Sequence, residues 1–255
     1  ILYWIDQKEL EQVLLDTMIS DIEVDTGLKL DVDKPYILWN TIFGTQKSPT
    51  TPEACQVISP YRGEPYGVES LNLLIQNAAR GGNIKRFGQV SGFTLGDKVI
   101  QYRNRPMSNP IKAYNFKSGQ IEKVAIYNGE LGIIKSHGFD RKTWREQSFR
   151  LTRFAVSFSR KPDLSINYGR KLGYDCLDEK PEDNLELAYA ISVHKAQGSE
   201  FKRVYFIVPK HKLALLSREL FYTGITRAET HCTLLVEEDI LPLLSMRRPE
   251  KSQLL

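Results

Sequence analysis

The sequence predicts strands and helices that alternate toward both ends of the chain, with a small β-barrel between them. Residues 185–193 alternate between apolar side chains and small or polar ones, a period of two that indicates a strand with one apolar face. The apolar run 204–208 is typical of a strand covered on both faces. Apolar residues spaced through 213–228 indicate a helix, and residues 233–236 complete the pattern as a short strand.

Five short strand-like runs, with no helical stretch among them, predict the barrel. Turn residues separate them at regular intervals, and Asn128-Gly129 is typical of a tight hairpin turn. The five runs are residues 98–102, 123–127, 132–135, 154–158 and 164–168.

Residue patterns in the part of the chain before the barrel predict two helices and a strand. Residues 7–20 have apolar side chains at helical spacing, and residues 54–59 form a short strand after a loop of turn-forming residues. Residues 68–79 again have helical spacing, and Gly81-Gly82 is expected to stop that helix.

Composition indicates a soluble globular protein. The chain has 255 residues, of which 41% are hydrophobic and 26% charged. No apolar run reaches membrane-spanning length, and no signal peptide opens the sequence. The three cysteines, Cys55, Cys176 and Cys232, are widely spaced, which predicts reduced thiols in a cytoplasmic protein and no metal site. A first residue of Ile instead of Met is what an excised fragment would show.

The net charge of +4 is unevenly distributed. Residues 1–33 hold nine acidic and two basic side chains, whereas residues 80–120 hold eight basic side chains and Asp97 as their one acid. Such a basic stretch, with aromatic residues interleaved, has the composition of a surface that contacts phosphates and stacks on bases. A solvated loop with aromatic residues in the core explains the same composition. The basic residues are Arg80, Lys85, Arg86, Lys98, Arg103, Arg105, Lys112 and Lys117, and the aromatic ones are Tyr102, Tyr114 and Phe116.

The C-terminal part offers three features suited to holding a nucleotide. They are a polar strand end, a turn containing glycine with a glutamate after it, and an arginine near the end of the predicted helix. Each also has an ordinary explanation: a surface histidine, a simple turn, and a cation that complements the helix dipole. In chain order the residues are Ser192, His194, Lys195, Gln197, Gly198, Glu200 and Arg227.

Several segments resemble those of one helicase family. VHKAQGSEF and LFYTGITRAE resemble motifs V and VI of superfamily 1 helicases, and AYAISVHKAQGSEF most resembles the RecD-like branch. QVISPYRGEPYGVESLNLLIQ is similar to the segment that opens the second RecA-like domain in that branch, although Arg62 is the single basic residue after its Ser-Pro pair. GDKVIQYRN and YNGELGII are similar to the SH3-like insertion of these helicases. The resemblance covers roughly residues 56–236.

The resemblance implies an α/β fold. Residues 1–91 and 175–255 would form a RecA-like domain of the P-loop-NTPase type, and residues 92–174 an SH3-like β-barrel inserted into it. In the family, ATP binds between two RecA-like domains. Carried onto matching positions, Arg227 would be the arginine finger. Gln197, Gly198 and Glu200 would lie at the nucleotide, with Glu200 bonded to the ribose.

The resemblance also implies contacts with single-stranded DNA. Ser192, His194 and Lys195 would face the strand. Arg62 would contact DNA or nucleotide, or cap local structure, and we expect Arg103 and Arg105 of the basic stretch to contact DNA as well. The expected partners are single-stranded DNA and the N-terminal RecA-like domain of the same protein, with no membrane.

The P-loop that cradles phosphates, GxxxxGK followed by Ser or Thr, does not occur in the sequence. We therefore expect the chain to be the C-terminal half of an ATP-dependent DNA helicase. ATP and Mg²⁺ would be bound mainly by an N-terminal half, and the isolated chain would be inactive. The alternative is a non-catalytic module that binds single-stranded nucleic acid or a protein, and a nucleotide-dependent scaffold is a third possibility.

Overall fold

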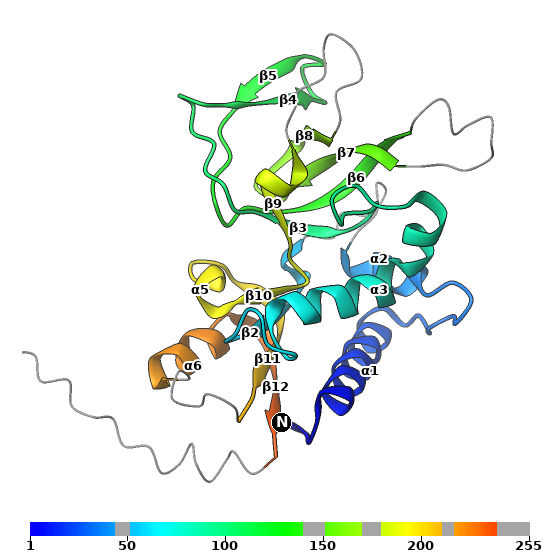
Figure 1. Ribbon diagram of the computed structural model, residues 1–255, viewed down its shortest axis with the longest axis vertical. Helices are drawn as coiled ribbons and strands as arrows, with labels where there is room; N and C mark the ends of the chain where they lie inside the picture. The colour runs from blue at the N-terminus through cyan, green and yellow to red at the C-terminus, as the bar shows by residue number, and fades with distance from the viewer. Residues whose placement is uncertain (44–51, 140–150, 170–179, 211–216, 239–255) are drawn as a thin grey trace, which may run out of the picture. The chain divides into compact units, whose positions relative to one another are not determined.

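The computed structural model describes residues 1–43, 52–139, 151–169, 180–210 and 217–238 (Figure 1). Contacts divide the chain into two compact units. The first consists of Ile1–Met18, Cys55–Leu71 and Ala190–Leu255, and the second of Ile19–Ala54 and Asn72–Tyr189. Each unit is built around its own sheet.

The first unit contains a five-stranded parallel sheet in the order β1-β12-β11-β2-β10. Its central strands are apolar because both of their faces are covered, and all five residues of β2 are buried. The sheet confirms the strands expected at 54–59, 204–208 and 233–236. The strands are β1 (Leu2–Trp4), β2 (Cys55–Ser59), β10 (Ala190–Ser192), β11 (Phe201–Val208) and β12 (Ala228–Glu237).

Helices α5 (Val193–Ala196) and α6 (Arg218–Ile225) lie together on one side of this sheet (Figure 1). The α6 helix begins after Ser217, whose hydroxyl accepts a hydrogen bond from the Leu220 N–H at 3.1 Å. The Phe206 ring of β11 meets the Phe221 ring of α6 edge to face, with centroids 5.5 Å apart. The predicted helix is thus confirmed over 218–225, and residues 213–216 lie outside the described part.

The single strand predicted over residues 185–193 is wrong. The structure has two strands there, and they belong to different sheets. β9 (Leu185–Leu187) pairs antiparallel with β3 (Lys98–Gln101), whereas β10 pairs parallel with β2. Only two residues, Ala188 and Tyr189, separate the two strands. The alternation of side chains therefore continues from β9 into β10 without a visible break.

The second unit contains a seven-stranded antiparallel sheet in the order β5-β4-β8-β7-β6-β3-β9. It includes all five predicted runs and one strand, β4, that the sequence reading missed. Its core consists of buried aliphatic and aromatic side chains, among them Val99, Phe154 and Tyr168. The α/β fold class is confirmed, and the SH3-like classification of this sheet stays a prediction. The remaining strands are β4 (Ile111–Asn115), β5 (Ile121–Val124), β6 (Leu131–Phe139), β7 (Leu151–Phe158) and β8 (Lys161–Gly169).

The predicted Asn128-Gly129 hairpin is wrong as well. Gly129 does form a turn, with φ +93, but that turn joins β5 to β6, which are not neighbours in the sheet. The Gly129 N–H donates to the Gln101 carbonyl at 2.8 Å, so this turn is bonded to the end of β3.

The longer helices end later than the sequence predicts. α1 runs over Gln7–Thr26 and α3 over Val68–Phe87, so the Gly81-Gly82 pair does not stop α3. α3 ends instead at Gly88, whose φ of +72 suits the position after a helix. Tertiary contacts explain the continuation, since Asn83, just after the two glycines, donates to the Leu95 carbonyl at 2.7 Å. The short helices are α2 (Tyr36–Phe43), η1 (Pro52–Ala54) and η2 (Pro181–Asp183).

Candidate nucleotide and nucleic-acid site

Two parallel strands bring predicted DNA-binding residues to the same edge of the sheet. Ser192, the last residue of β10, lies in register with Ser59, the last residue of β2. Arg62 follows β2, and His194 and Lys195 follow β10. Because parallel strands end at one edge, these residues all belong to the carboxyl edge of the sheet.

The one-turn helix α5 orients the polar residues after β10. The Ser192 hydroxyl caps it by accepting a hydrogen bond from the Lys195 N–H at 3.3 Å. Val193 and Ala196 are buried, which leaves His194 exposed and Lys195 partly exposed. The predicted strand end for His194 and Lys195 is therefore a capped helical turn that presents them to solvent.

The residues predicted to lie at the nucleotide form the turn before β11. Gly198 has a φ of +75, a left-handed conformation that explains why glycine stands there. A Cβ at Gly198 would meet no atom within 4 Å, so backbone conformation is the constraint at this position. Gln197 and Glu200 are exposed on either side of it. The turn therefore presents side chains and backbone to solvent.

Arg227 bonds this turn to the end of α6. Its Nη1 donates to the Ser199 carbonyl at 3.2 Å, and its Nε donates to the Thr223 carbonyl at 3.1 Å. The third donor, Nη2, reaches the Thr226 hydroxyl at 3.3 Å. All three acceptors are neutral. Within the described part of the chain, no carboxylate pairs with the half-buried guanidinium.

The backbone of Arg227 is also hydrogen-bonded to the start of β11. The Phe201 N–H donates to the Arg227 carbonyl at 2.8 Å, which joins the starts of β11 and β12. Gly224 sets the distance of α6 from the sheet. A Cβ there would lie 2.6 Å from Cε2 of the Phe206 ring, so α6 packs directly against this side chain.

The three predicted DNA-binding arginines have different surroundings. Arg62 is exposed, and its Nε pairs with Glu69 at 3.1 Å. Arg103 is exposed in the second unit. Arg105 is 8% exposed, and its Nε donates to the Asn109 carbonyl at 3.1 Å. The expectation of a surface cation at Arg105 is therefore wrong, because that side chain holds its own loop together.

Burial also divides the basic stretch 80–120. Arg80 and Lys98 are buried along with Arg105, so this stretch is not one continuous cationic surface. On the β4–β5 hairpin, the exposed rings of Tyr114 and Phe116 lie edge to face with centroids 5.4 Å apart. The basic residues that remain at the surface are Lys85, Arg86, Arg103, Lys112 and Lys117.

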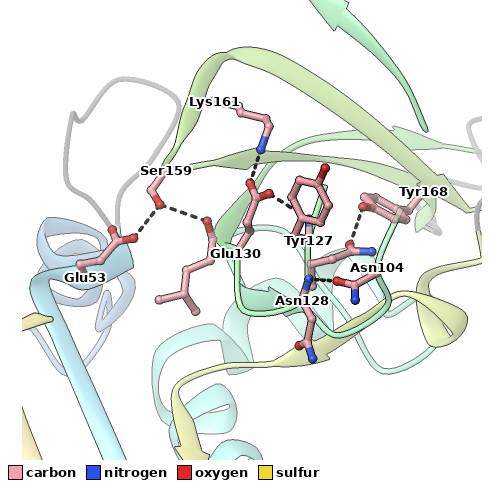
Figure 2. Close-up of polar contacts among 10 residues, drawn as sticks. Glu53, Asn104, Tyr127, Asn128, Glu130, Ser159, Lys161 and Tyr168 are labelled. Atoms are coloured by element: carbon pink, nitrogen blue, oxygen red, sulfur yellow. Dashed lines mark hydrogen bonds and ion pairs between the residues drawn. The ribbon is translucent and has the colours of Figure 1, made fainter. Parts of the chain in front are cut away.

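A group of polar residues that the sequence analysis did not single out holds the β5–β6 turn (Figure 2). The Asn128 N–H donates to Asn104 Oδ1 at 2.8 Å. The Tyr127 N–H donates to Glu130 Oε1 at 2.9 Å, and the other carboxylate oxygen of Glu130 pairs with Lys161. Glu130 is 5% exposed, so this ion pair is largely removed from water. The group thus stabilises the second unit.

Figure 2 also shows two contacts that flank this turn. The Tyr168 hydroxyl donates to Gln101 Oε1 at 3.1 Å, and the Ser159 hydroxyl donates to Glu53 Oε1 at 2.6 Å. These pairs lie 67 and 106 residues apart in the sequence, so no local pattern could have revealed them.

Among residues 1–43, 52–139, 151–169, 180–210 and 217–238, no group of three or more His, Cys, Asp or Glu side chains is arranged to hold a metal ion. No helix among those residues is long and apolar enough to cross a membrane.

Comparison with known proteins relates the chain to DNA helicases. Residues 187–235 match the family model of the UvrD-like helicase C-terminal domain. The chain is similar to the ATP-dependent RecD2 DNA helicase of Deinococcus radiodurans, with 31% identity over 180 residues, 69% of this chain and 19% of that protein. It is similar to the RecBCD enzyme subunit RecD of Buchnera aphidicola, with 23% identity over 242 residues, 92% of this chain and 34% of that protein.

Among solved structures, Pif1 helicase from Candida albicans matches with a TM-score of 0.39 and 15% identity, over 91% of this chain and 55% of that chain. The chain spans about a fifth of the length of the first of these curated relatives and about a third of the second.

Proposed function

We propose that the chain carries a superfamily 1 helicase C-terminal domain of the UvrD-like type and that it is the second RecA-like half of an ATP-dependent DNA helicase or translocase. The name of the Deinococcus radiodurans relative supplies the activity class. The phosphate cradle and the Mg²⁺ ligands would come from an N-terminal RecA-like half, since these 255 residues contain no P-loop.

The observation that carries this proposal is the environment of Arg227. Its three donors contact two carbonyls and one hydroxyl, so no anion neutralises the guanidinium within the described residues. An uncompensated, half-buried cation beside an exposed turn fits a group that pairs with phosphate oxygens. We propose that Arg227 stabilises the charge that develops on the transferring phosphoryl group of ATP.

The turn at residues 197–200 has a supporting role in this proposal. Exposed Glu200 would accept a hydrogen bond from the ribose, and Gln197 and Gly198 would lie along the nucleotide. The hydrogen bond from Arg227 to Ser199 connects the finger to this turn. Nucleotide contacts made by the turn and by Arg227 would therefore be coupled.

The test replaces Arg227 with Ala and with Lys in the full-length protein and measures ATP turnover with single-stranded DNA. An arginine finger contributes on the order of a thousand-fold in rate, so Arg227→Ala should lose about that much. Arg227→Lys should recover little, because an ammonium lacks the planar fork of donors. Arg218→Ala is the matched control, since Arg218 is exposed at the start of the same helix. Turnover within ten-fold of wild type in Arg227→Ala would reject the assignment.

We also propose that the carboxyl edge of the parallel sheet binds single-stranded DNA. Ser192, His194, Lys195 and Arg62 belong to this edge. After β10, His194 is exposed and Lys195 is partly exposed. Arg103 of the second unit would add a phosphate contact. We assign Arg105 to its loop because the buried guanidinium bonds to Asn109 and Pro110.

Oligonucleotide binding at several salt concentrations measures these contacts. The logarithm of the binding constant falls linearly with the logarithm of the salt concentration, and each phosphate neutralised on a single strand steepens that slope by roughly 0.7. Lys195→Ala and Arg103→Ala should each lower the slope by about that amount, whereas Arg105→Ala should leave the slope unchanged. Equal slopes in all variants would remove these residues from the interface.

A non-catalytic binding module is the second candidate function, and one observation favours it. The β4–β5 hairpin exposes Tyr114, Phe116 and Ile121, with 40%, 64% and 64% of each residue accessible. Such an apolar surface suits base stacking or protein docking without any nucleotide. A full-length protein that binds oligonucleotides but does not hydrolyse ATP would favour the binding module.

A further inference from the structure

A buried carboxylate joins three segments of the second unit. Asp97 has no exposed surface, and its oxygens accept three hydrogen bonds. Gln76 Nε2 donates to Oδ2 at 2.6 Å and the Thr94 N–H donates to the same oxygen at 2.8 Å. The Tyr189 hydroxyl donates to Oδ1 at 2.9 Å. Asp97 therefore connects α3, the loop before β3, and the two-residue link between β9 and β10.

A buried cation accompanies the carboxylate. Arg80 of α3 is 1% exposed, and its Nη1 donates to Asn40 of α2. Gly96 leaves room for the guanidinium, because a Cβ there would lie 2.8 Å from Arg80 Cζ. Burial raises the pKa of Asp97 to about 6, and hydrogen bonds together with the charge of Arg80 act in the opposite direction.

Both the hydroxyl and the ring of Tyr189 are held by contacts. Its hydroxyl donates to Asp97, and its ring meets the Phe43 ring edge to face, with centroids 4.9 Å apart. Burial and the neighbouring carboxylate raise the pKa of Tyr189, so the hydroxyl keeps its proton for this bond. Tyr189 is 1% exposed. Its position is thus determined by packing and by a charge-assisted hydrogen bond.

Tyr189 is also the point at which the chain leaves this unit. Contacts assign Tyr189 to the second unit and Ala190 to the first. The next three residues form β10, and the last of them, Ser192, caps the turn that presents His194 and Lys195. Fixing Tyr189 therefore fixes the start of a five-residue path to His194.

We propose that Asp97 and Tyr189 are positioning residues for nucleic-acid binding, because their hydrogen bond anchors the chain from which β10 and α5 extend. This inference rests on the proposed function of Ser192, His194 and Lys195. Neither Asp97 nor Tyr189 contacts the nucleic acid. Loss of their bond should weaken binding about 2- to 30-fold, the range typical of residues that act through others.

The test compares two substitutions that each remove one buried phenol hydroxyl from the second unit. Tyr189→Phe breaks the bond to Asp97, and the control Tyr168→Phe breaks the bond to Gln101 Oε1. A labelled oligonucleotide is titrated into wild type and both variants of the 255-residue chain. Weaker binding in Tyr189→Phe alone supports the proposal. Unchanged binding in Tyr189→Phe, or an equal loss in both variants, overturns it.

Coupling between the two residues gives a readout that a general loss of stability would not produce. If Tyr189 acts through Asp97, the double variant Tyr189→Phe/Asp97→Asn should bind no more weakly than the weaker of the two single variants. Additive losses in binding free energy would overturn the pairing.

Hydrogen exchange separates this inference from the proposed function. Amides of residues 190–196 should exchange faster in Tyr189→Phe than in wild type or Tyr168→Phe, whether or not nucleic acid is present. Wild type that fails to bind the oligonucleotide would refute the proposed DNA contact, and the exchange result would still decide the anchoring role. Unchanged exchange at 190–196 in Tyr189→Phe overturns the inference.

Discussion

Gly224 offers a sharp test of how α6 packs on the parallel sheet. In Gly224→Ala, the new Cβ would lie 2.6 Å from Cε2 and 2.9 Å from Cζ of the Phe206 ring. Phe206 has no exposed surface, and its ring is already in contact with Phe221. The ring therefore cannot move without disturbing the core between α6 and β11.

Two opposing effects determine the magnitude. Alanine is favoured over glycine in a helix by about 1 kcal/mol. Forcing an extra carbon into a well-packed core costs about 1–3 kcal/mol, and a contact this short belongs in the upper half of that range. We therefore expect Gly224→Ala to lower the free energy of unfolding by about 1–2 kcal/mol.

Gly82→Ala is the matched control because it isolates the helix effect. Gly82 lies inside α3, and a Cβ there would meet no atom within 4 Å. It should raise the free energy of unfolding by about 0.5–1 kcal/mol. Urea denaturation followed by circular dichroism measures both changes. If Gly224→Ala were as stabilising as Gly82→Ala, the close packing of α6 against Phe206 would be refuted.

Three further stability predictions use the same urea assay. Because burial raises the pKa of Asp97 from 3.8 to about 6, the folded chain binds this proton more tightly than the unfolded chain does. This contribution to the free energy of unfolding is present at low pH and should fall by about 1 kcal/mol from pH 5 to 7; an equal pH slope in Asp97→Asn would contradict it. Arg105→Ala should cost about 1–3 kcal/mol and Arg103→Ala less than about 0.5, because only Arg105 is buried; equal losses would refute the loop role of Arg105. Lys161→Met leaves a buried carboxylate without its cation and should cost about 1–3 kcal/mol, whereas Lys117→Met breaks an exposed pair and should cost less than about 1. A larger loss of stability in Lys117→Met than in Lys161→Met would show that burial does not determine how much these ion pairs stabilise the fold.

Elements with a strong local pattern were predictable from the sequence. The apolar run in β11 indicated a strand covered on both faces, and the parallel sheet confirms it. The boundary between β9 and β10 was not predictable, because both strands share one alternation and the break depends on which strand each one pairs with. The continuation of α3 through Gly81 likewise depends on contacts of the following turn with residues distant in sequence.

The same reasoning applies to the candidate site. Sequence identified Arg227 and the turn at 197–200 as candidates, although their roles stay predictions. It did not reveal the hydrogen bond between Arg227 and Ser199, which joins residues 28 apart. Composition identified Arg105 only as one of a run of basic residues, because it records charge and not the direction of a side chain. The partners of Arg105 include Asn184, 79 residues away.

The double attachment of Arg227 has a consequence for how such domains can be recombined. The Arg227 side chain donates a hydrogen bond to the Ser199 carbonyl, and the Arg227 carbonyl accepts one from the Phe201 N–H. These bonds hold the turn before β11 and the end of α6 together at the amino edge of the sheet. A chimera that exchanges residues 197–201 without 223–227 would mismatch the junction, whereas exchanging both segments together would preserve it.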